Sequence, residues 1–162
     1  MSNLKFYTKQ WEQDYPAFAR VLRALPADNL DYKPHERSTS AGDIAWQISE
    51  ELRYLTLLID TGVINWETLP RPATLDEIVA AYEENAEQHR ARLIAIDDEK
   101  WNGEGRLLFG GQEAMKSTVG EMCWSFFLDT IHHRGQLSAY IRPMGGKVPS
   151  IYGPSADDSG GM

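Results

Sequence analysis

Four long segments of the chain carry apolar residues at the spacing of amphipathic α-helices, and this pattern restricts the fold more than any other feature. Residues three or four apart lie on the same face of a helix, so each segment presents one apolar stripe. The segments cover residues 4–25, 41–60, 74–96 and 118–142. Helices of this kind bury their stripes against one another. The sequence therefore predicts an all-α four-helix bundle.

The ends of these segments carry recognisable start and stop signals. Three helix starts have capping pairs three residues apart, namely Ser40 with Asp43, Thr74 with Glu77 and Thr118 with Glu121. Gly62 is placed to end the second helix and Pro143 to end the last. Pro16 falls inside the first segment and removes a backbone donor. We expect one long helix there, with a local disturbance near residue 15.

The connections between the helices differ in length and composition. Residues 30–40 form a polar, extended connection, and residues 63–72 are expected to be a loop with aliphatic and tryptophan anchors. A long connection with four glycines, residues 97–117, precedes the last helix, and within it only Arg106–Phe109 could be a short strand. We expect one domain over residues 1–154, followed by a disordered tail at 155–162.

Composition excludes several classes of function. The net charge of −8 argues against a nucleic-acid-binding protein and against binding to anionic membranes. The single cysteine, Cys123, excludes an intramolecular disulfide and a zinc site built mainly from cysteines. No apolar run reaches the length of a signal peptide or a membrane span. The sequence therefore predicts a cytoplasmic protein.

The last helical segment contains polar residues on a face that should be buried. Asp129 and His133 lie four residues apart on or beside its apolar stripe, so their side chains meet on one helix face. This spacing suits two ligands of one divalent ion such as zinc or nickel, or a carboxylate that orients an imidazole by a structural hydrogen bond. A metal site needs a third protein ligand from a facing helix. The candidates are Gln47, Glu51 and His89.

Other polar residues of this region are expected to have structural roles. His132 points about 100° away from His133 around the helix, so the two rings cannot face the same centre. His89 on an apolar face is typical of a hydrogen-bonded core histidine. Arg134 is expected to form a salt bridge, and Cys123 to be a small core residue.

The segment from His132 to Ser155, with the sequence HHRGQLSAYIRPMGGKVPSIYGPS, resembles the C-terminal signature of the DinB-like family. The resemblance extends upstream through Tyr32–His35 and Ser40–Gln47 and so covers most of the chain. It implies a four-helix bundle with up-down-down-up topology, commonly dimeric, that holds zinc or nickel at one end. Members of the wider superfamily include metal-dependent thiol transferases and hydrolases.

The metal triad implied by this resemblance is one histidine on the second helix and an HxxxH pair on the last. The final histidine corresponds to His133, the position four residues before it is Asp129, and the position on the second helix is Gln47. A neutral amide is a poor ligand for a first-row ion beside imidazole and carboxylate. We therefore expect weaker metal binding than an imidazole at this position would give.

Two functions follow from these residues. In the first, Asp129 and His133 hold a divalent metal with Gln47 or Glu51 as a third ligand, and the protein acts on a small-molecule substrate as a metal-dependent hydrolase or thiol transferase. In the second, the bundle is free of metal and binds a small molecule or a protein partner in the same pocket. The resemblance also implies a homodimer.

Overall fold

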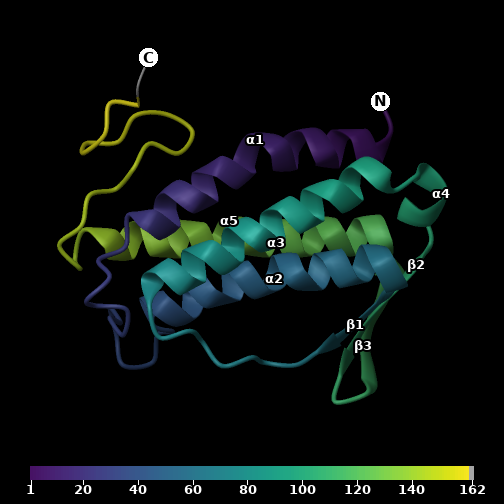
Figure 1. Ribbon diagram of the computed structural model, residues 1–162, viewed down its shortest axis with the longest axis horizontal. Coiled ribbons are helices and arrows are strands. Elements are labelled where there is room, and N and C mark those ends of the chain that lie inside the picture. The colour runs from purple at the N-terminus through teal and green to yellow at the C-terminus, as the bar shows by residue number, and fades with distance from the viewer. Residues whose placement is uncertain (161–162) are drawn as a thin grey trace.

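The structure is a computed structural model that describes residues 1–160, and it contains the four predicted long helices. These are α1 (Asn3–Arg23), α2 (Ala41–Thr61), α3 (Leu75–Ala95) and α5 (Val119–Ile141), with a one-turn helix α4 (Asp98–Trp101) between the last two. The helices α1 and α5 run in one direction and α2 and α3 in the other (Figure 1). Helix α2 packs against α3 and α5, and α1 packs against the same two helices from the opposite side.

The helix boundaries follow the predicted signals. The Ser40 hydroxyl accepts a hydrogen bond from the backbone N–H of Asp43, and complete capping boxes begin α3 at Thr74 and α5 at Thr118. Gly62 ends α2 with a left-handed φ of 75°. Helix α1 continues through Pro16 as one element, as predicted.

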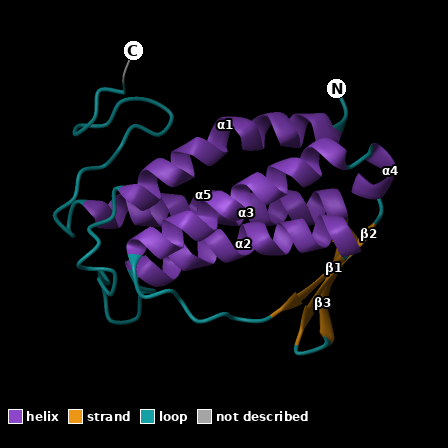
Figure 2. Ribbon diagram, in the orientation of Figure 1, coloured by secondary structure: helices purple, strands orange, loops and turns teal. Residues whose placement is uncertain are grey.

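A small sheet makes the fold not purely all-α, so that part of the prediction was wrong. Strands β1 (Val63–Trp66), β2 (Glu104–Phe109) and β3 (Gln112–Thr118) form one sheet in that order, with β1 parallel to β2 and β2 antiparallel to β3. The β2–β3 hairpin turns at Gly110 and Gly111, whose positive φ angles of 54° and 79° suit a tight hairpin turn. The predicted loop 63–72 therefore begins as a strand. Figure 2 shows the sheet projecting from one end of the bundle.

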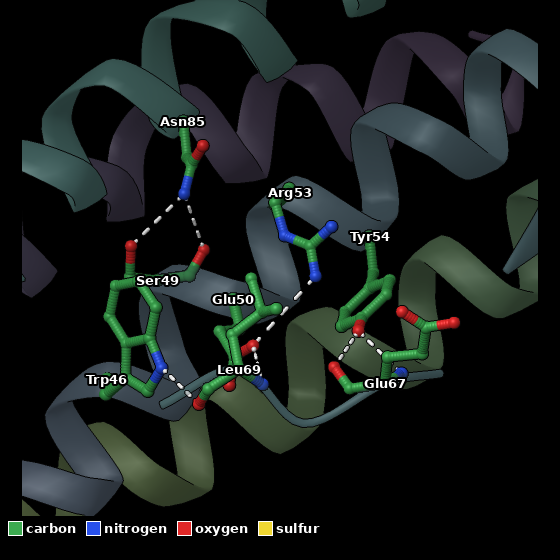
Figure 3. A network of polar contacts seen from close by, with 8 residues as sticks. All are labelled: Trp46, Ser49, Glu50, Arg53, Tyr54, Glu67, Leu69 and Asn85. Carbon is green, nitrogen blue, oxygen red and sulfur yellow. Dashed lines mark hydrogen bonds and ion pairs between the residues drawn. The ribbon is translucent and has the colours of Figure 1, made fainter. Parts of the chain in front are cut away.

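The segment after β1 is fixed to one face of α2 by three side chains spaced four residues apart (Figure 3). Trp46 Nε1 donates to the carbonyl of Leu69 at 3.1 Å, and the carboxylate of Glu50 accepts from the backbone N–H of Leu69 at 3.1 Å. The Tyr54 hydroxyl donates to the carbonyl of Glu67 and accepts from its N–H. Because these bonds pair backbone groups of the segment with side chains of one helix face, the segment has a defined path along α2.

Trp66, at the end of β1, lies between α2 and α5. Its ring stacks on Tyr54 of α2, with ring centroids 4.5 Å apart, and on Phe126 of α5 at 6.1 Å. Both interplanar angles are 20° or less. Tyr54 lies three residues after Glu51, and Phe126 three residues before Asp129. The stack of three rings therefore sets the spacing of α2 and α5 one helical turn from the predicted site.

The C-terminal segment covers a buried ion pair between α1 and α5. Arg134 Nη1 lies 2.9 Å from Asp14 Oδ1, and the Tyr152 hydroxyl donates to the same carboxylate while it accepts from Arg134. Farther along, Asp157 and Asp158 accept backbone hydrogen bonds within the segment as far as Gly160. The disorder predicted for residues 155–162 stays a prediction, and residues 161–162 lie outside the described part. Within residues 1–160, no helix has the length and apolar character needed to cross a membrane.

Candidate metal centre

One buried carboxylate from α2 meets the Asp129–His133 pair of α5. His133 Nε2 lies 3.4 Å from Asp129 Oδ2 and 3.8 Å from Glu51 Oε1. Each of the three residues offers one ligand atom, and these atoms all lie within 4.8 Å of one another. The spacing of four residues on α5 and the contact between α2 and α5 produce this arrangement directly. Glu51, Asp129 and His133 are named the triad below.

The triad is closed on the α2 side and open on the other. The side chain of Glu51 is 1% exposed and that of His133 is 14% exposed, whereas the side chain of Asp129 is 53% exposed. Glu51 and His133 therefore form the buried side of the site, and Asp129 lies at its opening to solvent. A site of this shape leaves room for a ligand from solvent at the Asp129 side.

Two buried atoms of the triad lack hydrogen-bond partners among the described residues. These atoms are Glu51 Oε2 and His133 Nε2. The other ring nitrogen of His133, Nδ1, lies 2.8 Å from Gln136 Oε1. With this acceptor-only oxygen as its partner, Nδ1 carries the proton and Nε2 turns a lone pair toward two carboxylates. Buried polar atoms are nearly always satisfied, and a metal-bound histidine usually donates its second N–H in this way. The unpartnered atoms therefore fit a bound cation.

The charge of Glu51 depends on whether a cation is bound. Burial is the main cause that raises the pKa of Glu51 to about 8; the nearby carboxylate of Asp129 acts in the same direction, and the hydrogen bond from Gln47 opposes the shift. A divalent cation reverses this balance, because it stabilises the ionised carboxylate. One imidazole and two carboxylates are ligands that zinc and other divalent first-row ions accept.

The structure distinguishes the three candidates for the third ligand by their positions. Glu51 faces the pair on α5. Gln47 lies one turn earlier on α2, where its Nε2 donates to Glu51 Oε1 at 3.0 Å; its role as a metal ligand stays a prediction. His89 lies outside the triad, with Nε2 3.4 Å from the Tyr7 hydroxyl and its ring 5.2 Å from that of Trp11.

The remaining candidates have the structural roles predicted for them. Arg134 is buried and pairs with Asp14, and its guanidinium lies 4.4 Å from the ring centre of Phe18. Cys123 is fully buried, and burial raises the pKa of its thiol, which fits a core residue. His132 is exposed, with its ring centre 5.5 Å from that of His133.

Two cavities lie on either side of the triad, and the sequence did not reveal either. A groove of about 390 Å³ is lined by Phe126 and Asp129 of α5 together with residues of the β2–β3 hairpin. A cleft of about 490 Å³ is lined by Gln47 and Trp46 of α2 together with residues of the segment after β1. A row of polar side chains runs from one cavity to the other through the triad. It begins at Gln47 in the cleft, which contacts Glu51, continues from Glu51 to His133, and ends at Asp129 in the groove.

The fold and the triad together define a helical-bundle protein with a candidate metal site between its second and last long helices. The sequence model of the DinB family matches residues 1–160. The chain therefore belongs to the DinB family.

Individual relatives agree with this assignment. The chain is 26% identical over 161 residues to the uncharacterized protein YrdA of Bacillus subtilis (strain 168), covering 96% of this chain and 91% of that protein. The crystal structure of the DinB-like protein YjoA from Bacillus subtilis matches with a TM-score of 0.67 at 21% identity, covering 86% of this chain and 91% of that one. A DinB-like protein from Bacillus cereus matches with a TM-score of 0.71 at 19% identity, covering 90% and 95%.

A more distant structural neighbour has a named activity. The mycothiol-dependent maleylpyruvate isomerase matches with a TM-score of 0.52 at 11% identity, covering 88% of this chain and 61% of that one. At this level of identity the likeness extends to the fold alone.

Proposed function

We propose that Glu51, Asp129 and His133 bind a divalent metal ion, zinc or nickel, and that the protein is a metal-dependent hydrolase or thiol transferase for a small-molecule substrate. The observation that carries this proposal is that Glu51 Oε2 and His133 Nε2 are both buried without a hydrogen-bond partner among the described residues, while the other oxygen of Glu51, Oε1, lies 3.8 Å from His133 Nε2. Leaving both atoms unsatisfied costs free energy that a shared cation would recover.

Each residue of the site has a separate task in this proposal. His133 donates from Nδ1 to Gln136, which fixes the ring with Nε2 toward the centre. Glu51 supplies a buried carboxylate that Gln47 orients through its amide. Asp129, at the exposed edge, can move without disturbing the core. A metal held by three protein ligands with one open position polarises a bound substrate or lowers the pKa of a bound water or thiol.

The choice between hydrolase and thiol transferase rests on fold-level likeness. The mycothiol-dependent maleylpyruvate isomerase, which shares the fold, uses a thiol. This supports thiol chemistry at the open position of the present site, which lies on the exposed side of Asp129.

The alternative is a metal-free bundle that binds a small molecule or a protein partner at the same place. A specific observation favours it: with a pKa of about 8, Glu51 without a metal is mainly protonated and uncharged at pH 7, so the buried side chain does not require a cation at that pH.

Elemental analysis of protein purified without an affinity tag distinguishes the two functions. We expect about one equivalent of metal in the wild type and none in Glu51→Ala, Asp129→Ala or His133→Ala. Gln47→Ala should keep the metal with weaker affinity, and Glu84→Ala, an exposed carboxylate on α3, serves as the matched control. Circular dichroism confirms that each variant is folded.

Three results would change the proposal. Wild-type protein that takes up no metal under metal-replete conditions supports the metal-free alternative. Loss of metal from Gln47→Ala with retention in Glu51→Ala makes Gln47 the third ligand. Retention of metal in His133→Ala excludes the triad altogether.

We also propose a homodimer, on the strength of the family resemblance. Multi-angle light scattering of the full chain tests this directly, since a monomeric mass at micromolar concentration contradicts it.

A further inference from the structure

The groove beside the triad has apolar walls and ends at a residue of the triad. Leu128 of α5 is 60% exposed and Met115 of β3 is 40% exposed, and both line the groove together with Phe126 and the buried Leu107 of β2. Single exposed apolar side chains are ordinary on a protein surface. Here they converge from two elements on one cavity of about 390 Å³, and Asp129 lines the same cavity.

Charge limits what this cavity can hold. The triad contributes two carboxylates, so a bound divalent ion leaves the centre with no net charge. The polar residues that line the groove are Ser125, Asp129 and His132, and none of its described lining residues is a lysine or an arginine. In the neighbouring cleft, Arg71 is already paired with Asp31 at 2.7 Å and with Asp43 at 3.2 Å. An anionic group on the ligand would therefore find no permanently charged cation in the groove, where His132 is the one described lining residue that can become cationic, by protonation.

We infer that the groove between α5 and the β2–β3 hairpin is the subsite for an uncharged, apolar chain of the substrate, whose polar reacting group lies at the triad. This inference rests on the proposed metal site and adds the chemical class of the substrate. A ligand of this class buries its chain against Met115, Phe126 and Leu128, and that burial supplies affinity in proportion to chain length.

A series of alkyl hydroxamic acids tests the inference, because each has the same metal-binding head, which is uncharged in solution at pH 7 and releases one proton when it binds zinc, and a tail of different length. Acetohydroxamic, butyrohydroxamic, hexanohydroxamic and octanohydroxamic acids are titrated by calorimetry into the zinc-loaded full-length protein. We expect affinity to rise about two- to fourfold for each added methylene until the groove is full. Zinc binding alone is measured first, in a separate titration.

Two surface variants and one matched control test whether the gain in affinity with tail length arises in the groove. In Leu128→Ser and Met115→Ser, zinc and acetohydroxamic acid should bind as in the wild type, while most of the gain with tail length is lost. Ile94→Ser removes an exposed aliphatic side chain on α3, 72% exposed and outside the groove, and should keep the full gain.

The outcomes separate this inference from the proposed function. If zinc does not bind, the metal proposal fails and the inference falls with it. If zinc binds but affinity is independent of tail length, or no hydroxamic acid binds, the groove is not an apolar subsite and the metal proposal stands. A gain with tail length that survives in both groove variants also overturns the inference.

Discussion

Replacing Glu51 by glutamine should stabilise the metal-free protein while it abolishes metal binding. Burial raises the pKa of Glu51 to about 8 from an ordinary value of 4.5. At pH 7 the unfolded chain carries an ionised Glu51 and the folded chain a protonated one, so folding requires uptake of a proton. One pKa unit corresponds to about 1.4 kcal/mol, so this uptake costs about 3 kcal/mol at pH 7. Glutamine has the same shape and no such cost.

The effect has a defined pH window. Between pH 4.5 and 8 Glu51 holds a proton in the folded state and loses it in the unfolded state, so the contribution of Glu51 to the stability of the wild type falls as pH rises through this range. Below pH 4.5 both states are protonated and the difference from Glu51→Gln disappears. Above pH 8 both are ionised and the difference is constant. The free energy of unfolding, measured in urea with EDTA from pH 4.5 to 9, should therefore diverge between the two proteins.

Excess zinc should reverse the order of stability at pH 7, because the metal binds only the folded wild type and adds about 4.1 kcal/mol at a thousandfold excess over its Kd, which exceeds the cost of about 3 kcal/mol. Glu84→Gln, an exposed carboxylate on α3, should follow the wild type in both series. The reasoning is refuted if Glu51→Gln is less stable than the wild type in EDTA at pH 8, or if the two proteins show the same pH dependence.

Three further predictions concern the core. Gly120→Ala should cost about 1–3 kcal/mol because its Cβ would lie 2.3 Å from Trp101 Nε1, whereas Gly135→Ala on the same helix meets nothing within 4 Å and should gain about 0.5–1 kcal/mol; urea unfolding of both variants checks this. Burial lowers the pKa of His89 to about 3, so between pH 6.5 and 5 only the unfolded chain gains a proton at this residue; the wild type should lose about 2 kcal/mol relative to His89→Leu over this range, while both proteins share the opposite contribution of Glu51. Tyr152→Phe should cost about 1–2 kcal/mol in thermal or urea unfolding, because it removes a hydroxyl that bridges a buried ion pair; an unchanged unfolding free energy would mean that water replaces the hydroxyl.

The helices could be predicted because their signals are local. Apolar period, capping pairs and the stop at Gly62 all lie within a few residues of the features that they determine. The sheet could not be predicted in this way. Strand β1 has only four residues, and its partner β2 lies on the far side of α3 and α4 in the sequence. Nothing in either segment alone specifies that pairing.

The candidate site likewise has one part that local sequence predicts and one part that depends on tertiary packing. Asp129 and His133 share a helix face by their spacing, so sequence predicts that they meet. The choice among Gln47, Glu51 and His89 depends on how α2 and α3 are rotated against α5, which is a tertiary property. Glu51 lies one turn beyond Gln47 on the same helix, and the structure turns that carboxylate to His133 while the amide binds the carboxylate.

The presence of Glu51, rather than the residue at position 47, beside His133 changes the charge of the site as well as its ligands. Three imidazoles, the set that the family resemblance implies, leave a divalent centre with two positive charges. The present triad of one imidazole and two carboxylates leaves it neutral. A doubly positive centre attracts anionic reactants over a distance of several ångströms, and a neutral one does not. The apolar groove without a lysine or arginine in its lining is the surface that such a neutral centre can use. With a divalent ion bound as proposed, the ligand set and the groove would therefore favour the same substrates, those with an uncharged head and an apolar chain.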